Sequence, residues 1–237
     1  SLSHAASKAV QSLAMRAGLP RFPRVFCRDA RISALLLRLA AARGVASDST
    51  PWSHTPMEAA MMCASAQPRG AEMPSVAGAE RGKVPHVAGA RTTDAFSASD
   101  TTALLVIVAS ELLMDPSAHV TPQQRSVLLG GIEAGVEYLL RHSSHTTDRL
   151  RGLFTDDPRG LPLAVTYWKD STFFPRTARP RSAADADSSD EPAGIDGPVA
   201  FAVAHAAAVA ALRAVTRLHG RGHPAYGGYL RAKAALP

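Results

Sequence analysis

Helical spacing of apolar residues, without strand-like alternation, is the feature that most restricts the fold of this chain. The clearest case begins at Thr121, which is followed by Pro122 and then by Gln124, a pattern typical of a capped helix start. From there apolar residues recur every three or four positions to about Arg141. Much of the apolar content is alanine, a strong helix former. The sequence therefore predicts an all-α protein.

The same spacing predicts six or seven helices arranged as αα-hairpins. Further helices are expected over about 4–17, 30–43, 56–66, 99–114, 198–219 and 224–235. In helix 30–43 we expect Asp29 as the N-cap and an inward stripe of Ile32, Leu35, Leu36 and Leu39. Helix 99–114 is apolar nearly all round, which predicts an interior position, with the helix that follows Thr121 packed outside it.

Composition narrows the class of protein. The 237 residues are 46% hydrophobic and 19% charged, and no apolar run is long enough to span a membrane, so we expect a soluble, cytoplasmic protein. An acid-free, arginine-containing start is also typical of an organellar transit peptide. The net charge of +6 comes from scattered arginines without a basic block. We therefore expect no nucleic-acid partner, although a basic helical nucleic-acid binder stays open as an alternative.

Metal and cofactor chemistry finds little support in the sequence. Cys27 and Cys63 are too few for a zinc site or a disulfide scaffold, which favours a reducing compartment. His142, His145 and Asp148 share a polar loop without a further ligand at a defined spacing. We expect no metal and no cofactor.

An aromatic and charged cluster at Tyr167–Ser171 is the strongest candidate for chemistry. Tyr167 and Trp168 offer flat faces on which a sugar ring can stack. Asp170 can give or take a proton, and the charge of Lys169 can tune it. The structural alternative is a helix start with Asp170 as the cap and Trp168 in the core.

Four segments in this order resemble one family. They are Ala17–Asp29, which contains Gly-Leu-Pro and Arg-Asp; Gly82–His86, Gly-Lys-Val-Pro-His; Ser99–Leu104; and Tyr167–Ser171, Tyr-Trp-Lys-Asp-Ser. Together they look like the glucosidase domain of glycogen debranching enzymes (amylo-alpha-1,6-glucosidase), in the six-hairpin glycosidase superfamily. The resemblance covers about residues 15–220. It implies a single domain over 1–237 that forms part of an (α/α)6 toroid. Independently of the resemblance, the Ser/Asp/Ala-rich composition of residues 182–194 predicts a polar low-complexity loop.

The resemblance also implies hydrolysis of α-linked glucans by inversion, which needs one protonated and one ionised carboxyl group. It assigns the general-acid role to Asp170, with Asp100 as the second candidate. It implies substrate-binding roles for Arg28, Asp29, His86, Tyr167, Trp168 and Lys169. The expected partner is an α-glucan or oligosaccharide.

Departures from the family pattern leave a second reading open. Cys27 stands where the family has glycine, Arg21 where it prefers tryptophan, and Tyr167 replaces the glycine before Trp168. A toroid needs twelve helices, and no counterpart of the general base is found before Pro237. We expect either a fragment completed by a missing C-terminal half or a reduced relative. The alternative function is a non-catalytic helical subunit for carbohydrate binding or assembly, whose exposed inner helices a partner would cover.

Overall fold

The computed structural model describes residues 25–45, 55–70, 79–88, 96, 98–143, 153 and 202–235. Within these ranges the chain forms six α-helices and no strand, apart from one isolated bridge between Phe26 and Val87. The helices are α2 (Cys27–Ala42), α3 (Thr55–Ala66), α4 (Thr101–Met114), α5 (Pro122–His142), α6 (Ala202–His219) and α7 (Pro224–Ala234). The all-α class is confirmed. The expected helix over 4–17 lies outside the described residues, as does the polar segment 182–194.

The start of α5 shows how local sequence sets a helix boundary. The Thr121 hydroxyl accepts a hydrogen bond from the Gln124 amide at 3.2 Å, and the Gln124 side chain accepts one from the Thr121 amide at 2.9 Å. This capping box satisfies two donors that the first helical turn leaves unpaired, with Pro122 at a position that needs no donor. The predicted start is confirmed.

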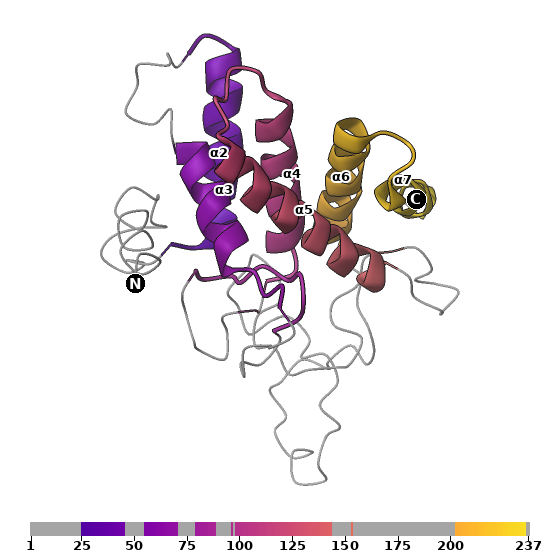
Figure 1. The fold of residues 1–237 in the computed structure, drawn as a ribbon. Helices are drawn as coiled ribbons and strands as arrows, with labels where there is room; N and C mark the ends of the chain where they lie inside the picture. The colour runs from indigo at the N-terminus through magenta and orange to yellow at the C-terminus, as the bar shows by residue number, and fades with distance from the viewer. Residues whose placement is uncertain are drawn as a thin grey trace, which may run out of the picture.

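Helices α2, α4 and α6 run side by side in the same direction (Figure 1). An ion pair between Arg28 and Asp100 joins the N-termini of α2 and α4. Arg38 reaches Asp115 at 3.0 Å just past the C-terminus of α4, and Glu111 near that end reaches Arg217 of α6 at 3.1 Å. Each of the three helices packs against the helix that follows it in the chain, so α3, α5 and α7 lie against α2, α4 and α6.

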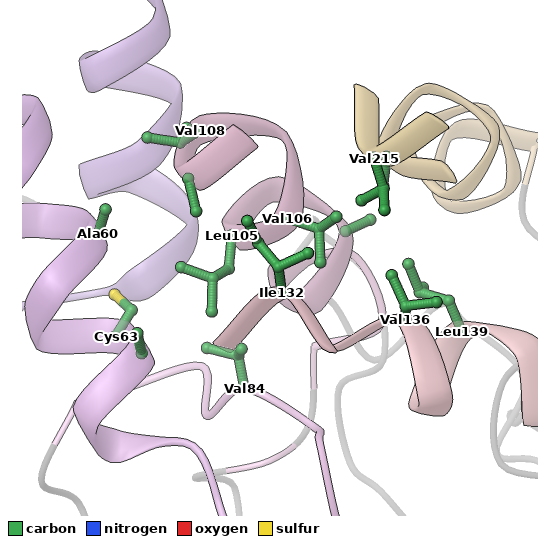
Figure 2. Close-up of a cluster of buried hydrophobic side chains, with 14 of the residues drawn as sticks. Ala60, Cys63, Val84, Leu105, Val106, Val108, Ile132, Val136, Leu139 and Val215 are labelled. Carbon is green, nitrogen blue, oxygen red and sulfur yellow. The ribbon is translucent and has the colours of Figure 1, made fainter. Parts of the chain in front are cut away.

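Helix α4 is the centre of the core and packs against α2, α3, α5 and α6. Its residues Leu105, Val106 and Val108 are fully buried, and Figure 2 shows them among side chains from α3, α5 and α6. Glycines on α5 let that helix approach closely, because a Cβ atom at Gly135 would lie 2.7 Å from the Val106 side chain. The expected interior position of helix 99–114 is confirmed.

The expected inward stripe of helix 30–43 is wrong. Ile32, Leu36 and Leu39 are 43%, 61% and 49% exposed, and Leu35 is half-buried. The buried residues of α2 are Cys27, Arg28, Ala30, Arg31 and Ala34. The small alanines allow close contact with neighbouring helices, and both arginines find acceptors at the N-terminus of α4, so the polar face turns inward.

The predicted N-cap of α2 is also wrong. Phe26 is the N-cap and makes no side-chain cap hydrogen bond, while Asp29 lies exposed in the first turn. The carbonyl group of His86 replaces the cap, because it accepts from the Cys27 amide at 2.7 Å. A distant loop therefore satisfies the start of α2. Asp29 still lies where the helix dipole favours a carboxylate.

Candidate functional site

The candidate site is built around the loop at 82–88, which begins at a glycine that no other residue can replace easily. Gly82 has a φ of +83°, and a Cβ atom there would overlap the backbone carbonyl of Ala134 on α5. Its amide donates to the Pro68 carbonyl at 2.8 Å, and its carbonyl accepts from the Gln67 side chain at 2.6 Å. The loop is thereby fixed to α5 and to the end of α3.

Beyond Gly82 the loop lies between the N-termini of α2 and α4. The Val84 amide donates to the Thr102 hydroxyl at 2.9 Å, and the Val84 carbonyl accepts from the Thr101 hydroxyl at 2.8 Å. Two residues further on, the His86 carbonyl accepts from Cys27. The same loop residues therefore hold the first turns of both helices in register.

Arg28 and Asp100 form a buried ion pair at this end. The Nε atom of Arg28 lies 3.1 and 2.9 Å from the two carboxylate oxygens of Asp100. Their side chains are only 8% and 9% exposed. Asp100 is the N-cap residue of α4, but its side chain makes no cap hydrogen bond. Its carboxylate serves the arginine, at a helix end where the dipole also favours a negative charge.

A second arginine, Arg31, lies one helical turn along α2 and is fully buried. Its Nη1 atom donates to the Thr101 carbonyl. Within the described part of the chain, the Arg28 Nη2 atom has no hydrogen-bond acceptor, while the Arg31 guanidinium group also lies beside the Cys63 thiol. Asp100 thus pairs with Arg28, whereas Arg31 contacts the backbone of the next residue, Thr101. The cluster is suited to an electron-rich oxygen group, such as a hydroxyl or a further carboxylate.

His86 lies next to the ion pair and completes the Arg28–Asp100 cluster, which we define as Arg28, Arg31, His86 and Asp100. The His86 ring meets the Phe26 ring edge-on, with the ring centroids 5.1 Å apart. The Lys83 side chain is fully buried, with Nζ 5.9 Å from the centroid of the Tyr138 ring. The cluster therefore combines segments from three separate parts of the sequence.

Of the residues predicted for the site, the structure pairs Arg28 with Asp100 and places His86 against Phe26 and Cys27 at the start of α2. Asp29 is exposed in the first turn of α2. The remaining candidates, Tyr167, Trp168, Lys169 and Asp170, lie outside the described residues. Among the residues the structure does describe, no group of three or more His, Cys, Asp or Glu side chains could hold a metal ion.

Sequence reasoning missed Arg31 and Cys63. The Sγ atoms of Cys27 and Cys63 lie 2.8 Å apart beside the cluster. The spacing of Arg28 and Arg31 by three positions on one helix face was a usable signal, because a charged pair with this spacing can mark a polar face that turns inward to acceptors. The contact between two cysteines that are 36 positions apart had no local signal.

No family model, curated protein or solved structure matches this chain. None of the helices in the described ranges is long and apolar enough to cross a bilayer.

Proposed function

We propose that this chain is part of a glycoside hydrolase that acts on α-linked glucans, of the inverting, debranching amylo-alpha-1,6-glucosidase type. The observation that carries the proposal is the pairing of Arg28 with Asp100, 72 positions away. The sequence resemblance places these residues, with His86, in one substrate site. All three lie at one end of α2 and α4. The proposal requires the motif segments to meet in space, and the three that the structure describes do meet there.

The arrangement of helices supports the toroid part of the proposal. Three parallel helices, each followed by a helix packed against it, are what half of an (α/α)6 toroid would present. In that reading α2, α4 and α6 are inner helices, and the cluster lies at the mouth of the ring. The exposed apolar stripe of α2 would then face further hairpins of the complete ring.

The ion pair suggests how the two candidate acids divide their roles. Both carboxylate oxygens of Asp100 lie within hydrogen-bond distance of Arg28, so neither oxygen is left free to protonate a leaving group. We therefore assign Asp100 to positioning Arg28, whose Nη2 atom would donate to a sugar hydroxyl group. Asp170 keeps the proposed general-acid role, with Trp168 as a stacking wall. Tyr167, Lys169, His86 and Asp29 would make further substrate contacts. Inversion also needs a general base, a role that none of these residues is assigned.

The decisive experiment measures binding of a branched limit dextrin to the full chain by isothermal titration calorimetry. Arg28→Gln and Asp100→Asn should each weaken binding by about tenfold or more, the loss typical of a charged hydrogen bond. Arg38→Gln and Asp115→Asn each remove a second described ion pair, which joins α2 to the residue after α4, and should leave affinity unchanged. The proposal would be overturned if the unaltered chain did not bind the dextrin. It would also be overturned if variants of the Arg38–Asp115 pair lost as much affinity as variants of the Arg28–Asp100 pair.

One observation favours the second candidate, a non-catalytic carbohydrate-binding or assembly subunit. The described carboxylate of the cluster is already engaged by Arg28, and inversion needs two carboxyl groups. Glucose release from the limit dextrin by the full chain, lost in Asp170→Asn, would exclude that candidate. Binding without glucose release would favour it.

A further inference from the structure

Cys27 and Cys63 form a buried pair between two helices. Cys27 is the first residue of α2, and Cys63 lies in the last turn of α3. Both side chains are fully buried and reduced, with their Sγ atoms 2.8 Å apart and sharing a hydrogen bond. The side chains therefore already point toward each other, as a disulfide bond between them requires.

We propose that Cys27 and Cys63 are a peroxide-oxidised dithiol site, in which Cys63 is the attacking thiol and Cys27 closes an intramolecular disulfide. The bond would fasten α2 to α3 beside Arg28. The proposal does not depend on the proposed hydrolase activity, since it rests on the sulfur pair and its surroundings alone.

The surroundings distinguish the two thiols. Burial by itself raises the pKa of Cys63, but the hydrogen bond with Cys27 and the positive charge of Arg31 outweigh burial and lower the pKa to about 7. Burial raises the pKa of Cys27 well above its usual value, and its hydrogen bond with Cys63 acts in the same direction. Cys63 is thus the thiol that ionises first, and Cys27 then donates its proton to the shared hydrogen bond.

The chemistry needs only hydrogen peroxide as the oxidant. The Cys63 thiolate attacks one peroxide oxygen, so an S–O bond forms, the O–O bond breaks, and the departing hydroxide takes up the proton that Cys63 had released. Sulfur of Cys27 then attacks Cys63 sulfenic acid. An S–S bond forms, the S–O bond breaks, and the second hydroxide takes the Cys27 proton. Two thiols lose two electrons, and peroxide is reduced to two waters.

Burial selects the oxidant. A peroxide molecule is little larger than water and can reach the pair through small openings of the α2–α3 contact. A bulkier disulfide such as oxidised glutathione needs a larger opening to place its sulfur in line with Cys63. A third ligand for a metal is not found beside the two sulfurs among the described residues, so a thiolate metal site does not compete there.

The test treats the full chain with hydrogen peroxide and maps its unreduced peptides by mass spectrometry. We expect a Cys27–Cys63 cross-linked peptide that dithiothreitol removes, formed at a rate that rises with pH through a midpoint near 7. Oxidised glutathione should act at least about tenfold more slowly. In Cys27→Ala, sulfenic acid should accumulate at Cys63 and react with dimedone. In Cys63→Ala, Cys27 should remain reduced.

Three outcomes would overturn the proposal: two reduced thiols after peroxide treatment, cross-links only between separate chains, or a rate midpoint near the ordinary thiol value of 9. Circular dichroism of each alanine variant checks that it keeps its helices. The cross-link and the pH dependence of its rate are both measured on the unaltered chain, so the test still holds if a variant fails to fold.

Discussion

Arg28 donates through Nε to both carboxylate oxygens of Asp100, and this contact joins the N-termini of α2 and α4 inside the protein. The two residues come from segments that the sequence alone linked only through a family resemblance. Their mutual burial makes the pair sensitive to removal of either partner, because a lone buried charge is left behind.

Asp100→Ala should lower the free energy of unfolding by about 3–5 kcal/mol, because it leaves the Arg28 guanidinium group buried without its carboxylate. Asp115→Ala breaks the more exposed pair with Arg38, together with two hydrogen bonds that Asp115 accepts from Ser117, and should cost only about 1–2 kcal/mol. Urea unfolding monitored by circular dichroism measures both. Equal losses would show that the N-terminal pair is no more protected from water than the C-terminal pair.

Gly82→Ala should be far more destabilising than Gly220→Ala. Both glycines have a φ of +83°, so alanine strains the backbone equally, by about 1–2 kcal/mol. At Gly220 the new Cβ atom meets open space, whereas at Gly82 it overlaps the Ala134 carbonyl. We expect the Gly82 variant to lose at least about 2 kcal/mol more in urea unfolding. Matching losses would contradict the close approach of this loop to α5.

The exposed leucine side chains of α2 should contribute little to stability, whereas the sequence pattern alone predicts that they are buried and contribute strongly. Leu36→Ala should change the free energy of unfolding by less than about 1 kcal/mol, because that side chain is 61% exposed. Leu105→Ala on α4 should cost about 2–5 kcal/mol, because Leu105 is fully buried in the core. A large loss for Leu36→Ala in thermal or urea unfolding would show that the stripe is covered in solution.

Helix positions were predictable from sequence because caps and periodicity act over a few residues. Thr121 and Gln124 specify the start of α5 locally, and the continuous apolar surface of α4 predicts its burial. The inward face of α2 was not predictable. Its leucine stripe is the more apolar face, so periodicity predicts that this stripe is buried, whereas the structure buries the face with the arginines. Burial of Arg28 and Arg31 depends on acceptors that α4 supplies about 70 positions later.

The candidate site was predictable only in part for the same reason. The resemblance selected Arg28, His86 and Asp100, which do lie together at one end of the helices. It gave no reason to expect Arg31 or the sulfur contact between Cys27 and Cys63, since both arise from packing between α2 and its neighbours. Such contacts follow from how closely helices approach, which periodicity does not encode.

The ionisation of Cys63 should make stability depend on pH. Folding lowers its pKa from about 9 to about 7, so between these values the unfolded chain binds more protons than the folded chain. The contribution of the Cys63 thiolate to the free energy of unfolding is therefore absent below pH 7, grows as pH rises, and is complete near pH 9. At higher pH the raised pKa of Cys27 lowers the free energy of unfolding, because Cys27 ionises more readily in the unfolded chain.

Under reducing conditions, the stability advantage of the unaltered chain over Cys63→Ala should thus increase between pH 7 and 9, by about 1–3 kcal/mol. Urea unfolding at pH 7, 8 and 9 in the presence of dithiothreitol measures this difference. Cys27→Ala removes the hydrogen bond that favours the thiolate and should show a smaller pH dependence than the unaltered chain. An advantage that stays constant or shrinks as pH rises would mean that Cys63 remains a neutral thiol in the folded protein.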